Sequence, residues 1–291
     1  MDQAEKLRNI IKSRNQQRQH TSRVITVTSG KGGVGKSSIS VNLAVQLSRL
    51  GKRVVILDAD FGLANVEVMF GLRPEYNLAD LMFSGKTIKE VITIGPENVG
   101  FISGGSGIRE LTNITGDQVR SLIPMLYELD QLADVIIIDT GAGISENVLE
   151  LVASSMEIIL VATPEPTSIT DVYALLKTLH RREDFMKDGT GIKMIANRTT
   201  SQEQGKELYE KLSIVVEKFL DIKMEYIGMV PQDDHLQKAI MKQKPLTISY
   251  PDSASARALM EIAAVLENGK QGTADRKKGI LELFSNLLRL K

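Results

Sequence analysis

The sequence has no cysteine and no tryptophan among its 291 residues, and aromatic residues make up only 4% of it. Without cysteine there can be no disulfide, no thiolate metal site and no cysteine-held iron–sulfur cluster, and the composition suits a reducing cytoplasm. The shortage of aromatic rings argues against a surface on which nucleobases stack. Cysteine chemistry is therefore excluded both as a source of stability and as a source of activity.

A net charge and a long apolar run are also missing. The 36 Lys and Arg balance the 36 Asp and Glu, so no overall field attracts nucleic acid or lipid, and any such attraction must be local. No apolar run reaches the roughly 18 to 20 residues that cross a bilayer, and the first residues, MDQAEKLRNI, are too polar for a signal peptide. We therefore expect a cytoplasmic protein that binds no specific nucleic acid.

Strand-like and helix-like segments alternate through most of the chain. Short apolar runs are separated by amphipathic stretches, which is typical of a parallel sheet with helices on both faces. The pattern predicts an α/β fold with a doubly wound, mostly parallel sheet of seven or eight strands flanked by helices. Expected strands lie at 23–29, 53–58, 98–105, 134–141, 157–164, 192–197 and 226–231, and expected helices at 37–50, 77–84, 116–131, 145–155, 168–183, 201–220, 234–242 and 253–268. We divide the chain into a basic arm (1–22), the main domain (23–268), a linker (269–275) and a tail (276–291).

The stretch TSGKGGVGKSS contains the phosphate-loop pattern, a glycine followed after four residues by Gly-Lys-Ser, between an expected strand and an expected helix. Glycines let successive backbone N–H groups face phosphate oxygens, and the helix start adds its positive dipole end. Lys36 is expected to reach the β- and γ-phosphates and Ser37 to ligate Mg²⁺. The alternative is a glycine-rich turn without a ligand. The expected nucleotide contacts in this loop are Gly30, Lys31, Gly32, Gly33, Val34, Gly35, Lys36, Ser37 and Ser38.

Carboxylates follow two further apolar runs. Asp58 and Asp60 end VVILDAD, and Asp139 follows VIII. Ligand sites of doubly wound sheets lie at the carboxyl ends of the strands. Asp139 has the place of a Walker B carboxylate, which is expected to hold Mg²⁺ through water because this ion keeps much of its hydration.

A second lysine in the loop, Lys31, exceeds what a phosphate cradle needs. KGGVGKS resembles the deviant Walker A motif of the MinD/ParA group of P-loop ATPases, and the resemblance covers about residues 23–250. It implies an ATP-dependent homodimer in which Lys31 crosses the interface and brings positive charge to the partner's transferring phosphoryl group. The alternative is a lysine merely tolerated in an exposed loop. Nitrogenase iron-protein relatives share the loop but need cysteines, so they are excluded.

The same resemblance assigns roles to residues outside the loop. It implies that Asp60 positions or deprotonates the attacking water, that Asp58 supports the water shell of Mg²⁺, and that Asn65 contacts the nucleotide or the partner. A later asparagine, Asn197, would bind the adenine edge, and Pro231 and Gln232 of GMVPQDDH would bracket the base through their backbone. No guanine-binding NKxD motif is visible, so ATP and ADP are expected rather than guanine nucleotides.

The tail, RKKGILELFSNLLRLK, combines an apolar helical face with a basic border. Such a helix lies in a membrane interface without spanning it, and MinD-like ATPases, which the chain resembles, carry a targeting helix at this end. One helix binds weakly and reversibly, whereas a dimer carrying two gains avidity. The alternative is that the tail packs back on the domain. The expected lipid-facing residues are Ile280, Leu281, Phe284, Leu287 and Leu288.

The arm begins with DQAEKLR, residues 2–8, which resembles the activating motif of the FlhG branch (also called YlxH or FleN) of the MinD family. That branch regulates flagellar number and placement. The resemblance implies that the arm forms a helix on the GTPase FlhF and supplies Gln3, whose carboxamide can orient a water near a γ-phosphate. It also suggests flagellar C-ring proteins as partners. From the residues alone, a solubilising segment is the favoured alternative, and only the motif argues against it.

The leading prediction is thus an ATP-driven dimerising switch that hydrolyses ATP slowly, associates peripherally and reversibly with the inner membrane, and acts in flagellar assembly. A division-site regulator of the MinD type shares the chemistry but predicts no role for residues 2–8. A DNA-segregation ATPase of the ParA type would need a cationic surface for phosphate contacts, which the balanced charge and the apolar tail disfavour. A nucleotide sensor without turnover is the remaining alternative.

Overall fold

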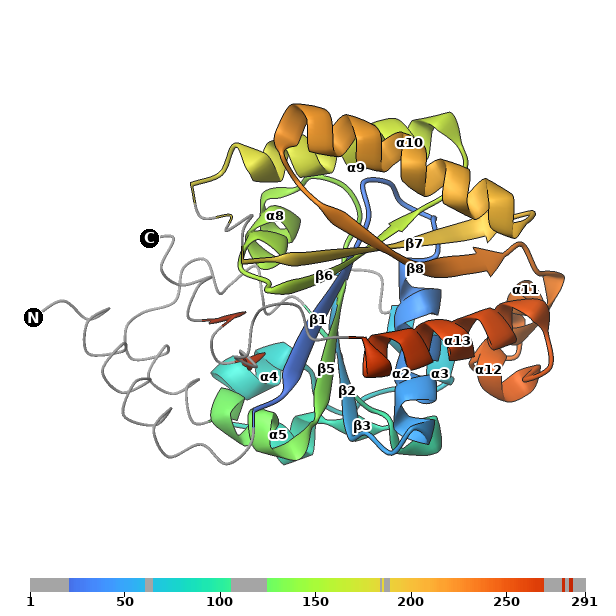
Figure 1. Cartoon of the computed structure of the whole chain (residues 1–291). Coiled ribbons are helices and arrows are strands. Elements are labelled where there is room, and N and C mark those ends of the chain that lie inside the picture. Colours follow the sequence, from blue (N-terminus) through green and yellow to red (C-terminus); the bar gives the residue numbers. More distant parts are fainter. Residues whose placement is uncertain are drawn as a thin grey trace, which may run out of the picture.

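The computed structural model of the protein describes residues 21–60, 65–105, 125–183, 185, 189–269, 279–280 and 283–284. Within these residues, eight strands form one sheet in the order β3-β4-β2-β5-β1-β6-β7-β8 (Figure 1). All neighbouring strands are parallel except the edge pair β3–β4. The strands are β1 (Arg23–Thr28), β2 (Val54–Ala59), β3 (Thr93–Ile94), β4 (Gly100–Ile102), β5 (Val135–Thr140), β6 (Glu157–Ala162), β7 (Gly191–Thr199) and β8 (Met224–Pro231). The predicted doubly wound α/β fold is confirmed.

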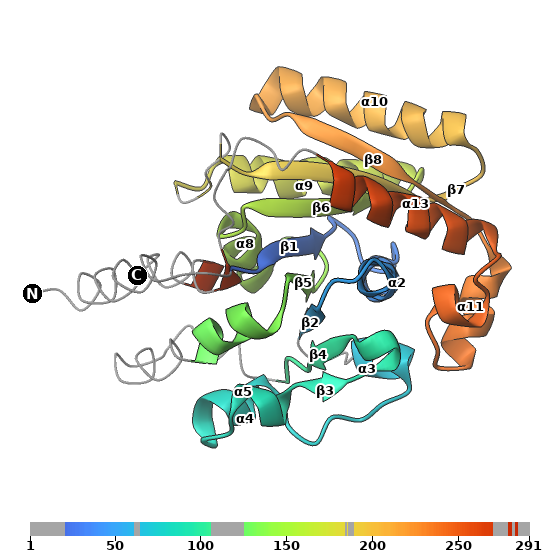
Figure 2. The same cartoon turned by 60° about the horizontal axis from the view of Figure 1, so that its bottom comes forward.

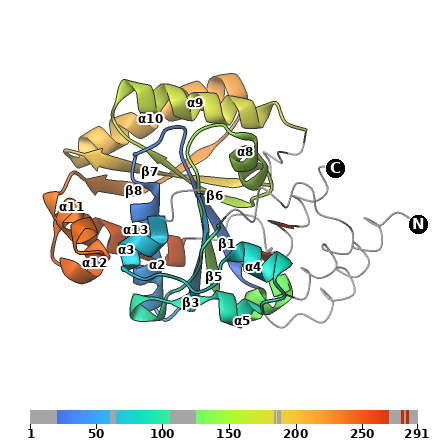
Figure 3. The same cartoon turned by 180° about the vertical axis from the view of Figure 1, so that it is seen from behind.

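Helices cover both faces of the sheet, because five of its strands are apolar runs that leave neither face for water. On one face, α2 packs over the central strands and α13 packs beside it, and Figure 2 views α2 nearly end-on. On the other face, α8, α9 and α10 cover the β6–β8 half, as the view from behind shows (Figure 3). The helices are α2 (Lys36–Arg49), α3 (Asn65–Phe70), α4 (Leu78–Phe83), α5 (Ile88–Val91), α8 (Glu146–Ala153), α9 (Pro166–His180), α10 (Gln202–Leu220), α11 (Asp234–Met241), α12 (Leu246–Ser249) and α13 (Ala254–Asn268).

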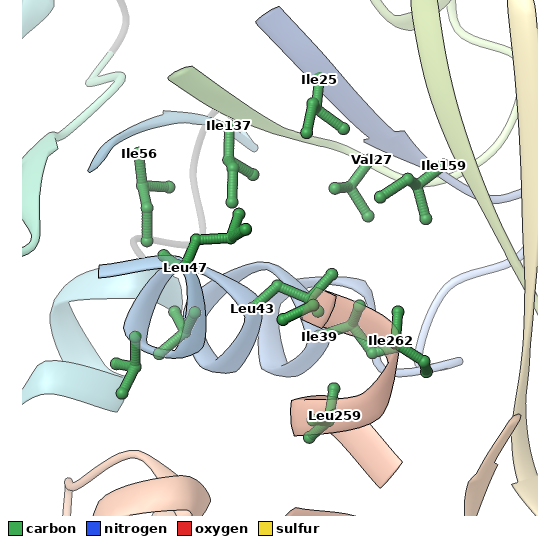
Figure 4. Packing of buried hydrophobic residues seen from close by; sticks show 14 of the residues in the cluster. Ile25, Val27, Ile39, Leu43, Leu47, Ile56, Ile137, Ile159, Leu259 and Ile262 are labelled. Carbon is green, nitrogen blue, oxygen red and sulfur yellow. The ribbon is translucent and has the colours of Figure 1, made fainter. Parts of the chain in front are cut away.

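The largest hydrophobic cluster fixes the helix that follows the phosphate loop. Ile39, Leu43 and Leu47 project from α2 at helical spacing toward the sheet, while Leu259 and Ile262 of α13 close its other side (Figure 4). Burying apolar side chains on both sides of α2 stabilises it far more than its own propensity does. The amino end of α2, and with it the phosphate loop, is therefore held rigidly against the ends of the strands.

The structure also contains elements that the apolar pattern did not predict. The two-residue strand β3 and the short helices α3, α5 and α12 were not expected. Elements this short bury few side chains, so they leave little periodicity in the sequence. Of the expected helix at 116–131, residues 125–131 are helical and the rest lie outside the described residues.

Candidate functional site

The phosphate loop runs from the end of β1 to the start of α2, and two of its glycines are required by close packing. A Cβ on Gly30 would lie 2.5 Å from the backbone nitrogen of Val172 in α9. Gly35 has φ 96°, in the left-handed region, and a Cβ there would lie 2.5 Å from the Asn197 side chain. The loop is thus pressed between α9 and the end of β7, and glycine is the residue that fits both contacts.

Lys36 stands at the first position of α2 with its side chain largely buried. Burial lowers the pKa of its ammonium group, while the nearby Asp139 and Asp60 act in the opposite direction. Ser37 follows on the same helix, and its side chain lowers the pKa of the Asp139 carboxyl. The lysine and the serine of the predicted phosphate site are therefore gathered at the helix start, next to Asp139, the predicted Walker B carboxylate.

Asp139, at the end of β5, is fully buried. Its Oδ1 accepts a hydrogen bond of 2.9 Å from Ser40 Oγ, whereas its Oδ2 is buried and has no hydrogen-bond partner within the described residues. Burial raises the pKa of this carboxyl to about 6, although Ser37, Ser40 and Lys36 favour its charged form. Sequence reasoning missed Ser40, yet it lies one helical turn after Ser37 and so shares the face toward β5.

Asp58 lies directly beside Asp139, because the two are register partners on β2 and β5. Burial, reinforced by repulsion from Asp139, raises the pKa of Asp58 to about 7, against two hydrogen bonds from the backbone N–H groups of Asp60 (3.1 Å) and Val66 (3.3 Å). Two adjacent buried carboxyls favour a cation between them or nearby. Within the described residues, no cluster of three or more acidic or histidine side chains could hold a metal by itself.

Asp60 lies two residues after Asp58, just beyond the end of β2, and is half-buried. Its Oδ2 accepts a hydrogen bond of 3.0 Å from the Asn65 side-chain amide, and its Oδ1 is 3.3 Å from where a Cβ on Gly141 would stand. The predicted catalytic carboxylate is thus held by Asn65 and faces the loop after β5. Asn65 contacts Asp60 here, which is a contact that the sequence did not predict.

The second lysine points away from the phosphate-loop interior. Lys31 Nζ lies 2.9 Å from Glu165 Oε2 and 2.9 Å from Thr167 Oγ1, at the start of α9, and its side chain is 37% exposed. The contact with Lys31 lowers the pKa of Glu165. Sequence reasoning missed Glu165 and Thr167, because only the sheet shows that β6, which precedes them, lies next to β1.

The residues predicted for the adenine side lie at the ends of β7 and β8. Asn197 is buried, and its Nδ2 donates to the Val34 carbonyl of the phosphate loop at 2.7 Å. Gln232 N–H donates to the Thr199 carbonyl at 2.9 Å, and Pro231 ends β8 opposite Thr199. The structure therefore brings all three to the edge of the sheet that carries the phosphate loop, with Asn197 tied to the loop itself.

The tail and the arm are described only in part. Ile280 and Phe284 were expected to face lipid, but both are buried, at 0% and 2% exposure, in the cluster that packs on β2 and β5. In this structure these two apolar side chains are part of the hydrophobic core, as expected for the alternative in which the tail packs back on the domain. Leu281, Leu287, Leu288, Gln3 and the motif at 2–8 lie outside the described residues. No helix within the described part of the chain is both long and apolar enough to cross a membrane.

Comparison with known proteins places these features in a family. The family model described as "ParA: NUBPL iron-transfer P-loop NTPase" matches residues 20–267. The chain belongs to this ParA/MinD family of P-loop NTPases. It is 39% identical over 265 residues to the antiactivator FleN of Pseudomonas aeruginosa, with 91% of this chain and 92% of FleN covered. It is 29% identical over 295 residues to the flagellum site-determining protein YlxH of Helicobacter pylori, with 99% and 98% covered.

The fold is similarly shared with solved structures of the ParA/MinD family. The septum site-determining protein MinD of Pyrococcus horikoshii, complexed with Mg-ADP, superimposes with a TM-score of 0.66 over 85% of this chain and 96% of that one, at 24% identity. The chain is thus an ATPase regulator of the MinD/ParA type, and the Mg-ADP bound by the MinD neighbour agrees with the predicted cofactors. The predicted family, activity and cofactors are confirmed.

Proposed function

We propose that this ATPase is an ATP-dependent dimerising switch that regulates the number and placement of flagella. The observation that carries the proposal is the separation of the two loop lysines. Lys36 is buried at the helix start, whereas Lys31 is held 2.9 Å from Glu165 on the outside of the loop, where a second subunit can receive it. A lysine placed there completes a phosphate site only when two subunits meet, so ATP binding and dimer formation depend on each other.

Within one subunit, the loop glycines and Lys36 hold the phosphates, and Ser37, Asp58 and Asp139 would hold Mg²⁺. The buried, unpartnered Oδ2 of Asp139 fits this role, since a hydrated cation supplies the donor that the oxygen lacks. When bound, Mg²⁺ neutralises charge that develops on the phosphate oxygens. Asn197, Pro231 and Gln232 complete the site on the base side.

Asp60 is the residue that positions the attacking water and accepts its proton. Asn65 holds one carboxylate oxygen at 3.0 Å, which leaves the other directed toward the Gly141 loop. Lys31 of the partner subunit supplies the positive charge that the phosphoryl group needs as the bond breaks. Turnover therefore depends on dimer formation and is slow in the single subunit.

The flagellar role rests on the match to FleN and YlxH along nearly the whole chain. In this flagellar role, residues 2–8 stimulate an FlhF-type GTPase through Gln3, and C-ring proteins are further partners. The tail binds the inner membrane reversibly from the cytoplasm. A division-site role of the MinD type is the second candidate, because the fold is equally that of MinD.

Dimerisation is tested by light scattering with saturating Mg·ATP. Asp60→Ala blocks hydrolysis and is expected to be a dimer, whereas the Asp60→Ala, Lys31→Ala double variant is expected to be a monomer that still binds nucleotide. Asp60→Ala combined with Lys218→Ala, which removes an exposed lysine on α10, is the matched control and should dimerise. A monomeric Asp60→Ala protein under these conditions would refute the switch.

The flagellar and division-site candidates are separated with the arm. A peptide of about the first twenty residues should stimulate GTP hydrolysis by an FlhF-type GTPase, and the same peptide with Gln3→Ala should not. If the wild-type peptide leaves the GTPase rate unchanged, the division-site role becomes the better explanation. Sedimentation with anionic vesicles in ATP and in ADP tests the membrane role, and equal binding in both states would contradict a nucleotide-driven switch.

A further inference from the structure

Asp130, in the helical segment at 125–132, is a buried carboxylate at which the two ends of the described chain meet. Its side chain is 0% exposed, and ionisable groups are rarely buried unless they are paired or hydrogen-bonded. Oδ1 of Asp130 accepts hydrogen bonds from Ser22 Oγ and, at 3.0 Å, from the backbone N–H of Ile280. Ser22 is the last residue of the arm, directly before β1, and Ile280 lies at the start of the described part of the tail.

The contact with Ile280 is a helix cap supplied from a distant part of the sequence. Leu283 N–H donates to the Gly279 carbonyl at 3.3 Å, which marks the first helical turn of the tail. The N–H groups of a first turn have no partner inside the helix, and Ile280 N–H is one of them. A carboxylate also suits the positive dipole end of a helix, so Asp130 stabilises the tail in this position.

Gly279 fits against Asp130 because it has no side chain. A Cβ at this position would lie 2.5 Å from Asp130 Cγ and closer still to both carboxylate oxygens. Beyond this contact, Ile280, Leu283 and Phe284 are buried in the cluster on β2 and β5. The tail is therefore fastened at two points, by a polar contact at its start and by apolar packing after it.

The arm and the tail protect the same oxygen from water. Ser22, like Asp130, is 0% exposed. If either segment leaves, water reaches the carboxylate and replaces the hydrogen bond that the departing segment supplied. The carboxylate then has less to gain from the remaining segment, because water can also replace that donor. The favoured states are therefore the one in which both segments are bound and the one in which both are released.

We propose that Asp130 is a positioning residue that couples the chain at Ser22, where the N-terminal arm joins β1, to the attachment of the C-terminal tail at Gly279 and Ile280. Release of the tail loosens the chain at Ser22, and displacement of the arm loosens Gly279 and Ile280. Coupling of this kind is reciprocal by necessity. One consequence is that binding of a partner to the arm strengthens binding of the tail to a membrane, and the reverse. This consequence rests on the proposed function, whereas the coupling itself does not.

The coupling is tested on the full-length protein by amide hydrogen exchange with mass spectrometry, without nucleotide, lipid or partner. Ser22→Ala removes a donor from the arm side only, and peptides that cover 279–284 are expected to exchange about tenfold faster, the usual effect of losing a hydrogen bond to a charged group. Ser84→Ala is the matched control, since Ser84 Oγ donates to the Asp80 carboxylate at an exposed position. It should leave the tail unchanged.

The effect of the tail on the chain near Ser22 is tested with a variant of the tail. Gly279→Ala forces the tail away from Asp130, and peptides that cover 21–25 are expected to exchange faster by a similar factor. Gly191→Ala is the control, because a Cβ there meets nothing nearer than 3.8 Å. A single cooperative unfolding transition for every variant shows that the domain remains folded. If each variant speeds exchange only in its own segment, the coupling is refuted.

The membrane role is kept apart from this test. Gly279→Ala is also expected to sediment with anionic vesicles without ATP, since its tail is free. Reciprocal changes in exchange without vesicle binding would leave the coupling standing and contradict the membrane role. Vesicle binding with exchange changes confined to the mutated segment would support the membrane role and refute the coupling.

Discussion

Two carboxyl groups buried side by side predict that this protein, without its ligands, becomes less stable as pH rises. Asp58 and Asp139 are register partners at the ends of β2 and β5, and both are buried. Burial and mutual repulsion raise the pKa of Asp58 from 3.8 to about 7. The folded chain therefore keeps a proton on Asp58 at pH values where the unfolded chain has already lost it.

The sign and the size of the effect follow from this difference. A folded-state pKa above the unfolded one stabilises the folded chain at low pH, and that stability is lost as pH rises from about 4 through about 7. Between pH 5 and pH 7 the unfolded carboxyl is ionised and the folded one is mainly protonated. At about 1.4 kcal/mol per pH unit, and with the folded carboxyl half ionised at pH 7, the free energy of unfolding falls by about 2 kcal/mol by pH 7 and about 3 kcal/mol by pH 8. Asp139, whose pKa is raised to about 6, adds a change of the same sign.

The assay is urea denaturation in EDTA at several pH values from 5 to 8, for the wild type and for Asp58→Asn. The variant cannot ionise at this position, so its stability should fall by about 3 kcal/mol less over the same range. The pH slope, and not the absolute stability, is compared, because Asn also disturbs the hydrogen bonds from Asp60 and Val66. Asp252→Asn, at an exposed position, is the control and should keep the wild-type slope. Equal slopes for the wild type and Asp58→Asn would refute the reasoning.

Three further predictions concern the loop and the tail. Gly30→Ala should abolish ATP binding in calorimetry and lower the melting temperature, because its Cβ would meet the backbone of α9; unchanged affinity would show that α9 can move aside. Asn197→Ala removes the 2.7 Å hydrogen bond to the Val34 carbonyl and should weaken ADP binding about tenfold, whereas Asn268→Ala, at the end of α13, should leave affinity as it is. Phe284→Ala empties a buried site and should make the tail cleavable by protease at concentrations that leave the wild type intact; equal cleavage would mean that the packing of Phe284 does not hold the tail.

Much of the fold could be predicted because it depends on local patterns. The continuous apolar runs at 134–141 and 157–164 contain β5 and β6, since a strand covered on both faces has no polar side to show. Gly35, Lys36 and Ser37 could be recognised because the order strand, glycine loop, helix is itself what makes a phosphate site. The edge strand β3 escaped prediction because two residues carry no period, and its antiparallel direction depends on a turn that returns the chain.

Short local patterns account for the predicted chemistry of this protein, namely the phosphate loop, its second lysine and the carboxylates that follow apolar strands, because the function of each pattern needs only neighbouring residues. Tertiary structure decided which distant groups meet. It placed Glu165 beside Lys31, put Asp58 against Asp139, and brought Ser22 and Ile280 to one oxygen of Asp130. These contacts span many residues, and their partners are chosen by the order of strands and the packing of the core, which no local pattern contains.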